Sequence, residues 1–350
     1  MNTPPISIHS PRTVTGQQDE TIAFLSNAFS YGFPGASIER IETHCSIVFL
    51  LGDRAYKLKR AVAFSALDFS TLERREAACR AELVLNRRTA PELYLGVRAI
   101  RREPGGTLAF DGDGPVVDWV VVMRRFAQDD LFDRLAEARR LTPGIIRALA
   151  DEIARFHASA ERTPDFGGAD GLRDMIEGNL RDQLTVDSVL GRTGIELLHR
   201  SSLSALAHES PLLDRRRDEG RVRRCHGDLR LANICLFDGR PTLFDAIEFC
   251  DRIACIDVWF DLAFLLMDLR YRGLDALAEV LIERYIAASG DRGGLSTLPL
   301  MMSVRAATRA YTLANSVLRR RTPNDAQQTA ESARNHLTLA ISLLIPATAP

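Results

Sequence analysis

The change of hydrophobic pattern near residue 126 constrains the fold of this chain more than any other sequence feature. Before it, residues 20–125 contain apolar runs typical of strands, with one helical segment. After it, residues 126–350 carry apolar side chains mostly at helical spacing. A chain of 350 residues exceeds one typical core. We therefore expect an α+β protein with two lobes, a small strand-rich N-lobe over 20–125 and a larger, mainly helical C-lobe over 126–350, and a ligand in the cleft between them.

Composition argues against several classes of function. A formal net charge of -1 gives the chain no overall attraction to nucleic acid or to a membrane surface. No apolar run reaches the roughly 18 residues that span a bilayer. Residues 1–19 are predicted to be a flexible arm rather than a secretory signal. The six cysteines are scattered, and Cys250, Cys255 and His226 fit no standard zinc spacing. We predict a cytoplasmic protein with neither nucleic acid nor membrane as partner.

A hairpin is the clearest element of the N-lobe. The stretch "CSIVFLLGDRAYKLK" has an apolar run from Ile47 to Leu51, a turn signal at Gly52, and an alternating second strand. Because side chains alternate along a strand, Lys57 and Lys59 point to the same face.

The single helix of the N-lobe is predicted in "DFSTLERREAACRAELVLNRR". It begins after a cap at Ser70 or Thr71 and is stopped by Pro91. Two further strands follow, in "LYLGVRAI" and "GPVVDWVVVMRRF".

The C-lobe is predicted to consist of helices. Thr142 caps a helix that has Pro143 in its first turn and His157 on its apolar face. Further helices are expected over 171–210, 258–287, 298–320 and 325–345, whereas the charged stretch "LLDRRRDEGRVRR" (212–224) is interpreted as a solvated loop.

A polar cluster interrupts the C-lobe where strands would normally exclude carboxylates. The motif "HGDLRLAN" carries Asp228 and Asn233, and Asp245 follows a hairpin whose turn is "DGRP". The hairpin is expected to bring Asn233 and Asp245 close together. Two oxygen donors suit Mg²⁺ when phosphate supplies other ligands, and Asp228 would then be free to accept a proton or orient a hydroxyl.

These residues resemble those of a known family. H-G-D-x-x-x-x-N followed by an Asp, together with "FDAIEF", "IDVWFDLAFLLMDL", "YKLKRAV" and "ELVLNRRTAPELYLGV", is similar to aminoglycoside phosphotransferases and choline-kinase-like enzymes. The resemblance covers roughly residues 20–345 and points to a bacterial branch of unassigned substrate. It implies a protein-kinase-like fold and ATP- and Mg²⁺-dependent transfer of the γ-phosphate to a hydroxyl of a small molecule. Some relatives carry an additional P-loop domain; no G-x-x-x-x-G-K-[ST] occurs here, so we expect a single phosphotransferase module.

The resemblance also implies roles for residues of the cluster. Asp228 would accept or orient the acceptor hydroxyl, and Asn233 and Asp245 would bind Mg²⁺. Arg230 would contact the transferred phosphate, although a solvent-facing loop arginine is an equally good interpretation.

Two residues of the cluster are expected to support it. His226 is expected to bond backbone rather than act as a base. Asp257 would brace the catalytic loop by resemblance; with Asp261 it can equally cap the following helix.

The sequence leaves alternatives open for the residues that would bind the nucleotide. A strand lysine should bind phosphate and pair with a helix glutamate, and Lys57 is preferred to Lys59 as the more central in its strand. Among the helix glutamates, Glu82 fits the family spacing best, ahead of Glu73 and Glu76. The glycine-rich loop is absent, and Ser46 could supply a hydroxyl or amide there.

Several other functions compete with this interpretation. A nucleotide-binding regulatory protein with little transfer activity needs the same residues. A protein kinase is disfavoured because "DAIEF" replaces D-F-G, and a metal-dependent hydrolase would need no strand lysine. Five Asp and one Glu between residues 245 and 268 hint at a cationic acceptor, and Glu248 and Asp251 could meet it or remain solvated.

Overall fold

The computed structural model of this chain describes residues 12–13, 18–64, 67–317 and 322–345. Their contacts form two compact groups. We call the described residues of Ile8–Arg134 and Ile234–Cys250 the strand unit, and those of Leu135–Asn233 and Asp251–Pro350 the helical unit. Most of the arm predicted over 1–19 lies outside the described residues. The predicted boundary between 125 and 126 stays a prediction.

A six-stranded antiparallel sheet forms the strand unit, in the order β2-β3-β4-β8-β6-β7. The predicted hairpin is confirmed: its two strands pair with Val48 opposite Lys57. A separate short pair joins β1 to β5. The strands are β1 Arg12–Thr13, β2 Glu39–Glu42, β3 Ser46–Leu51, β4 Arg54–Lys59, β5 Val62–Ala63, β6 Tyr94–Arg102, β7 Leu108–Phe110 and β8 Val116–Arg124.

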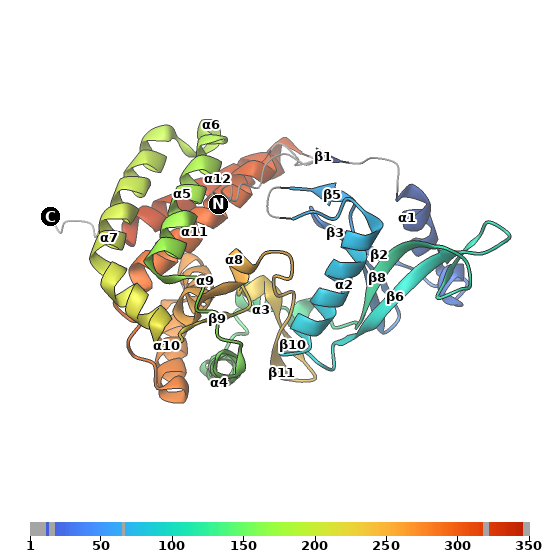
Figure 1. The fold of residues 1–350 in the computed structure, drawn as a ribbon, viewed down its shortest axis with the longest axis horizontal. Helices are drawn as coiled ribbons and strands as arrows, with labels where there is room; N and C mark the ends of the chain where they lie inside the picture. The colour runs from blue at the N-terminus through green and yellow to red at the C-terminus, as the bar shows by residue number, and fades with distance from the viewer. Residues whose placement is uncertain (1–11, 14–17, 65–66, 318–321, 346–350) are drawn as a thin grey trace. The chain divides into compact units, whose positions relative to one another are not determined.

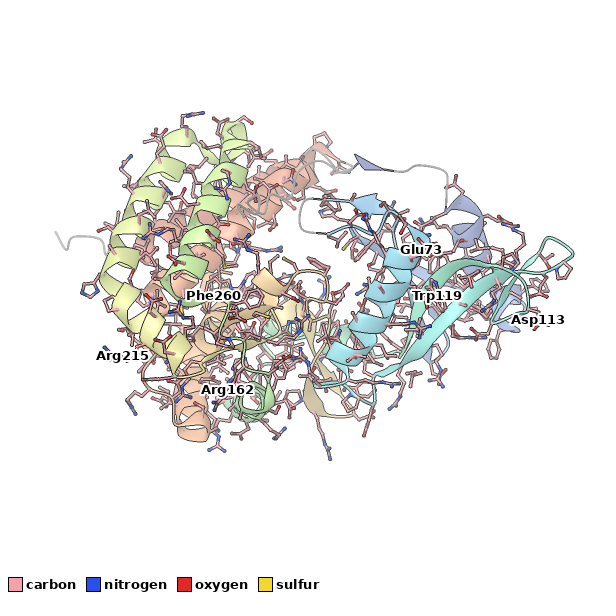
Figure 2. The ribbon with its side chains drawn as sticks, viewed as in Figure 1. Glu73, Asp113, Trp119, Arg162, Arg215 and Phe260 are labelled. Atoms are coloured by element: carbon pink, nitrogen blue, oxygen red, sulfur yellow. The ribbon has the colours of Figure 1, made fainter. Side chains whose placement is uncertain are left out.

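The two faces of this sheet are covered differently, because successive side chains of β8 point to opposite sides. Val121 faces the core that includes α2 (Leu72–Asn86), whereas Val120 and Val122 face a second core with α1 (Asp19–Leu25) and η1 (Ala28–Tyr31). Figure 2 shows Trp119 of β8 beside α2. The guanidinium carbon of Arg80, on α2, lies 5.1 Å from the centre of the Trp119 ring.

The helix α2 begins where the sequence predicts and ends earlier than predicted. Thr71 is the cap, and its hydroxyl accepts from the backbone N–H of Arg74 at 3.3 Å. The helix ends at Asn86, five residues before Pro91, because turns follow in which Asn86 O accepts from the N–H of Ala90 at 2.7 Å.

A second hairpin belongs to the strand unit although it comes late in the chain. Strands β10 (Ile234–Phe237) and β11 (Arg240–Leu243) pair with Ile234 opposite Leu243, as predicted. Its turn is tighter than expected, with positive φ at Asp238 (48°) and Gly239 (77°), the combination that a two-residue hairpin turn requires.

Helices dominate the helical unit. The preceding η2 (Gln128–Asp130) belongs to the strand unit, and α3 (Phe132–Glu137) contains the division between the units, after Arg134. In Figure 1, α5 runs beside α7, and α11 packs against both α9 and α12; α4 packs against α10. No helix among the described ranges is long and apolar enough to cross a membrane. The helices are α4 Pro143–Ser159, α5 Gly168–Leu184, α6 Asp187–Leu190, α7 Arg192–Asp218, α8 Asp251–Ala254, α9 Val258–Tyr271, α10 Asp275–Ser289, α11 Leu298–Ser316 and α12 Pro323–Ser342.

Most predicted helix boundaries in this unit hold, one predicted helix is divided, and one predicted end cannot be compared. Thr142 caps α4, with its hydroxyl 3.3 Å from the N–H of Ile145. The helix expected over 258–287 is two helices, α9 and α10, because Gly273 adopts a left-handed φ of 69° between them. The end of the helix expected over 298–320 falls on residues 318–320, outside the described residues.

The interpretation of residues 212–224 as a solvated loop is wrong. Their first part ends α7, where Arg216 is 1% exposed, and their last part is strand β9 (Val222–Arg224), which pairs with β12 (Cys255–Asp257). A dense run of charge resembles a loop in sequence, but here one arginine is neutralised by buried aspartates that are distant in the chain.

Candidate active site

Two lysines of the strand unit share one buried glutamate. Lys57 and Lys59 point to the same face of β4, and α2 presents Glu82 to them, with no exposed side-chain surface. Lys57 Nζ donates to Oε1 of Glu82 at 2.8 Å, and Lys59 Nζ donates to Oε2 at 2.6 Å. The structure therefore brings Glu82 to the lysines. Glu73 and Glu76 do not join it, since Glu73 lies in the first turn and Glu76 pairs with an arginine one turn later.

Each lysine also has a second carboxylate partner. Lys57 Nζ lies 2.5 Å from Oδ1 of Asp245, and Lys59 Nζ lies 2.5 Å from Oε1 of Glu248. The suggestion that Glu248 meets a cationic substrate is therefore disfavoured, because its carboxylate is buried against Lys59. The result is a row of five alternating charges, Asp245–Lys57–Glu82–Lys59–Glu248, which we call the charge row.

The charge row shifts the pKa values of its members. Burial alone would raise the pKa of Glu82, but Lys57 and Lys59 lower it to about 2. Burial opposes the charged form of Lys57, and Asp245 and Glu82 nevertheless raise its pKa well above the usual value. Glu248 differs, since its burial outweighs the charges of Lys59 and Lys57 and raises its pKa. Glu82 is therefore held as the anion that fixes both lysines.

The backbone at Asp245 is held in an unusual conformation. Its φ is 63°, in the left-handed region that non-glycine residues rarely adopt. The N–H of Asp245 donates to the hydroxyl of Tyr94 at 3.2 Å, and the next N–H, of Ala246, donates to Oδ1 of Asn86 at 2.9 Å. The Asp245 side chain stays 45% exposed. These contacts direct an accessible carboxylate while its main chain is fixed.

Ser46 lies at the start of β3. It is buried and pairs with Lys59 across the hairpin. Its N–H donates to the hydroxyl of Thr43 at 3.0 Å, so this amide already has a partner. A role of Ser46 toward phosphate remains a prediction.

In the helical unit, Asp228 and Asn233 lie on the loop that follows β9 and closes in η3 (Leu231–Asn233). Arg230 donates from Nε and Nη2 to the two carboxylate oxygens of Asp228, at 2.7 and 2.8 Å. Asn233 donates from Nδ2 to the carbonyl O and to Oδ2 of Asp228, both at 2.8 Å. Burial would raise the pKa of Asp228, but the guanidinium of Arg230 lowers it below the usual value. Asp228 is thus a carboxylate that is fully engaged in this structure.

Asp261, which the sequence interpretation left as a helix cap, holds this loop. Its carboxylate accepts from the backbone N–H of His226 at 3.0 Å and of Gly227 at 2.9 Å. His157 approaches it with Nε2 at 3.1 Å. Burial opposes ionisation of Asp261, but the hydrogen bond and charge of His157 and the charges of His226 and Arg305 lower its pKa to about 2. His226 is fully buried in the loop, and its structural role remains a prediction.

The bracing contacts predicted for Asp257 are therefore found at Asp261, one helical turn later. Asp257 caps α9 by accepting from the N–H of Trp259 at 2.8 Å. It also binds Arg216, which donates to both its oxygens at 2.7 and 2.9 Å and to both oxygens of Asp291 at 2.9 Å. Sequence reasoning missed Arg216, Asp291 and the bracing role of Asp261, because their partners lie 34 to 104 residues away in the chain.

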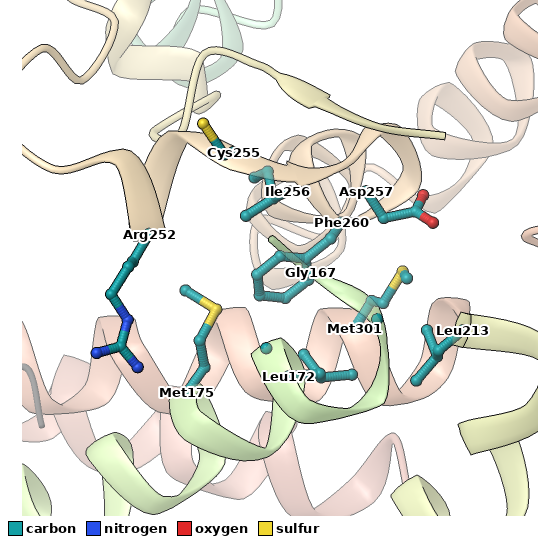
Figure 3. A pocket seen from close by; sticks show the side chains of 12 residues that line it. Gly167, Leu172, Met175, Leu213, Arg252, Cys255, Ile256, Asp257, Phe260 and Met301 are labelled. Atoms are coloured by element: carbon teal, nitrogen blue, oxygen red, sulfur yellow. The ribbon is translucent and has the colours of Figure 1, made fainter. Parts of the chain in front are cut away.

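A small pocket, with a volume of about 40 Å³ open to water-sized molecules, also lies in the helical unit (Figure 3). Leu172, Met175, Phe260 and Met301 line it, together with glycines of α5 and its N-cap. Asp228 and Asn233 do not line this pocket. The lining is mainly apolar. Arg252, Cys255 and Asp257 also reach the pocket, and both carboxylate oxygens of Asp257 accept from Arg216.

Comparison with known proteins relates this geometry to a family. A sequence model described as the phosphotransferase enzyme family matches residues 72–297. Proteins from Mycobacterium bovis and Mycobacterium tuberculosis, both described as uncharacterized, are 33% identical over 273 residues, 77% of this chain and 53% of theirs. The chain thus spans about half the length of the curated relatives it matches.

Solved structures share the fold at low identity. A choline/ethanolamine kinase family protein from Mesorhizobium loti is 16% identical, with a TM-score of 0.54 over 93% of this chain and 99% of that one. A microcompartment-associated aminopropanol kinase has the same TM-score and identity over 93% and 97%. A thermostable mutant of an aminoglycoside phosphotransferase, in ternary complex with AMP-PNP and hygromycin B, is 14% identical. Its TM-score is 0.51, over 95% of this chain and 100% of that one. The predicted protein-kinase-like fold is confirmed.

Proposed function

We propose a reaction for this chain, which belongs to the phosphotransferase enzyme family: it transfers the γ-phosphate of ATP to a hydroxyl group of a small molecule, with Mg²⁺. The observation that carries the proposal is the charge row of the strand unit, in which a buried Glu82 anion fixes Lys57 beside Asp245. That lysine–glutamate pair next to a metal-binding aspartate is what kinases use to hold nucleotide phosphates. A similar fold that holds AMP-PNP supports ATP as the donor.

The donor atoms that are present fit a magnesium ion. The Nδ2 of Asn233 donates its hydrogen bonds to Asp228. The Oδ1 of Asn233 is therefore the atom that would bind a hard cation. Asp245 offers an accessible carboxylate two residues after β11, the second strand of the hairpin that begins directly after Asn233. We assign these two residues to Mg²⁺, which supplies charge neutralisation on the phosphates when bound. Lys57 would bind a phosphate oxygen, and Glu82 would keep it in place.

Asp228 would orient the acceptor and take its proton. The acceptor oxygen forms a bond to the γ-phosphorus, the bond from that phosphorus to the β,γ-bridging oxygen breaks, ADP leaves, and the hydroxyl proton passes to the Asp228 carboxylate. Because Arg230 occupies both oxygens of Asp228, it has to release one of them to the hydroxyl. Its guanidinium would then be directed at the transferred phosphate, which it can bind bidentately.

The experiment that tests this is Asp228→Asn, assayed by consumption of Mg-ATP with a panel of small hydroxyl compounds. Loss of the proton acceptor should lower turnover by about 10² to 10⁴. Mg-ATP affinity should change little, because nucleotide contacts are assigned to other residues. Asp238→Asn, a matched change in the hairpin turn, is the control and should keep full turnover. Equal turnover in Asp228→Asn would exclude this role.

One observation favours a second candidate, a nucleotide-binding regulatory protein with little transfer activity. The bidentate pairing of Asp228 with Arg230 blocks the carboxylate, as in a protein that binds Mg-ATP without using it. Arg230→Ala separates the two. A catalyst should lose turnover because the phosphate contact is removed, whereas a regulatory protein should show no turnover in either form and unchanged nucleotide affinity.

A further inference from the structure

The acidic residues between 245 and 268 do not form a free acidic surface for a cationic acceptor. Every one of the six has a partner within its own unit. The partners are Lys57 for Asp245, Lys59 for Glu248, Arg224 for Asp251, Arg216 for Asp257, backbone N–H groups and His157 for Asp261, and Arg272 for Asp268. The sequence hint toward a cationic acceptor therefore loses its basis, since the fold itself uses this charge.

Around Asp228, the surplus charge is positive instead. Arg305 and Arg309 lie one turn apart on α11, so their side chains share a helix face. Arg305 donates from Nη1 to the carbonyl of Gly227 at 3.3 Å and from Nε to the carbonyl of Phe260 at 3.1 Å. Because Gly227 directly precedes Asp228, this contact places the helix face that carries Arg305 and Arg309 against the loop of Asp228.

The charge of Arg305 is stabilised by two aromatic rings. Its guanidinium carbon lies 4.0 Å from the ring centre of Phe260 and 4.8 Å from that of Phe264. Arg230 lies over the same Phe264 ring, at 5.6 Å, while it binds Asp228. Arg230 is therefore paired with a carboxylate. Arg305 is held by two backbone carbonyls and two aromatic rings, and its buried Nη2 has no hydrogen-bond partner among the described residues.

Arg309 is the third arginine near the loop, and its guanidinium makes no hydrogen bond or ion pair with any described residue. It is half-buried, and Asp228 and Asp268 are the carboxylates close enough to affect it. Both have other partners: Arg230 binds Asp228, and Asp268 accepts from the N–H of Leu231 and from Arg272, each at 3.1 Å. Burial and the neighbouring charge of Arg230 lower the pKa of Arg309 to about 10. A partly buried guanidinium without an anionic partner lowers the stability of the fold, unless a ligand supplies the missing anion.

We propose that the acceptor carries an anionic group, a carboxylate or a phosphate, which Arg309 binds while Asp228 faces the acceptor hydroxyl. This rests on the proposed function and deepens it by naming the substrate class. A guanidinium presents paired N–H donors that match both anions bidentately. The acceptor is thus a hydroxy acid or a phosphorylated alcohol.

The test uses matched acceptors on the full chain, with Mg-ATP consumption as the readout. One series is glycerate, glycerol phosphate, glycerol and serinol; the other is gluconate, glucose phosphate, glucose and glucosamine. Each series offers a carboxylate, a phosphate, a neutral compound and a cation on a common skeleton. We expect an anionic compound to have the highest kcat/KM, and the two anionic arms identify which group is bound.

Arg309→Gln then locates the anion. We expect KM for the anionic acceptor to rise about 10- to 100-fold, the usual effect of losing a charged hydrogen bond, with KM for Mg-ATP unchanged. Arg309→Lys should recover part of the loss. Arg147→Gln, a matched change at an exposed residue of α4, should alter neither KM.

Three results would overturn the assignment. They are a neutral or cationic compound with equal or higher kcat/KM, an effect of Arg309→Gln on Mg-ATP rather than on the acceptor, or wild-type chain that binds Mg-ATP and responds to no anionic compound. Failure of the proposed function gives a different result: Mg-ATP itself does not bind, whichever acceptor is added.

Discussion

At the scale of single residues, Lys57 and Lys59 share Glu82 and have different outer partners. Lys57 contacts Asp245, whose side chain is 45% exposed, and Lys59 contacts Glu248, whose side chain is 6% exposed. A ligand can reach the first pair and replace one of its contacts. The second pair is enclosed on all sides, so its ions depend on each other for compensation.

This difference predicts different effects for one substitution at two positions. Lys57→Met should weaken Mg-ATP binding by about tenfold or more, because a charged phosphate contact is lost. Lys59→Met should lower the free energy of unfolding by about 3 to 5 kcal/mol, because it leaves Glu248 without its buried partner. Calorimetric titration and urea unfolding measure the two quantities. Undiminished nucleotide affinity in Lys57→Met would favour a hydrolase that needs no strand lysine.

Asp261 predicts a pH dependence of stability. Its pKa of about 2 in the folded chain lies below the roughly 3.9 of an unfolded aspartate. The carboxylate therefore stabilises the fold above about pH 4, and this contribution, about 2 to 3 kcal/mol, is lost as pH falls from about 4 to about 2. Urea unfolding at a series of pH values should show the difference between wild type and Asp261→Asn shrinking across that window. A difference that stays constant down to pH 2 would contradict this.

At the scale of elements, Arg216 joins three segments of the helical unit. It projects from the last turn of α7, binds the N-cap of α9 through Asp257, and binds Asp291 in the connection between α10 and α11. With 1% of its surface exposed and four donor contacts of 2.7 to 2.9 Å, it has exchanged water for two carboxylates.

Removing Arg216 should therefore leave the buried carboxylates of Asp257 and Asp291 without their cationic partner. We expect Arg216→Ala to lower the free energy of unfolding by about 3 to 5 kcal/mol. Arg216→Lys should recover only part of this, since an ammonium cannot form both pairs of parallel hydrogen bonds. Urea denaturation followed by circular dichroism gives both values. A lysine variant as stable as wild type would show that charge alone, without the guanidinium geometry, holds these segments.

Elements with a local signal could be predicted from the sequence. The hairpin of Lys57 follows from strand alternation and a turn, Thr71 and Thr142 from cap chemistry, and Glu82 from its spacing within the helix of the resembling family. Long-range pairings have no such signal. Nothing near Arg216 reveals Asp291, and nothing near Gly227 reveals Asp261, because only tertiary packing brings these groups together. Charged stretches are for this reason misread as loops when their partners are remote.

At the scale of the whole molecule, nucleotide binding should appear as added thermal stability. Mg-ATP at about a hundred times its dissociation constant contributes roughly 2.7 kcal/mol, which corresponds to a shift of a few degrees in Tm. We expect the shift to need Mg²⁺ and to disappear in Asp245→Ala. Differential scanning fluorimetry with ATP, with and without Mg²⁺, measures it. A Mg²⁺-independent shift that persists in Asp245→Ala would remove this residue from the metal site.

The general architecture was predictable because strand and helix patterns are segregated along the chain. The strand-rich and helical parts, and the fold they form, follow from periodicity and from the motif around Asp228. The grouping of the late hairpin with the early strands does not, because Cys235 and Phe237 carry no mark of the core that they join with Leu93 and Tyr94.

The chain has two tryptophans, and each unit contains one. Trp119 lies on the sheet beneath a guanidinium, and Trp259 lies fully buried at the start of α9. Intrinsic fluorescence therefore reports on the units separately: Trp259→Phe leaves a probe of the strand unit, and Trp119→Phe a probe of the helical unit. Coincident emission changes during urea unfolding would identify one cooperative transition, and separated changes would give each unit a stability of its own.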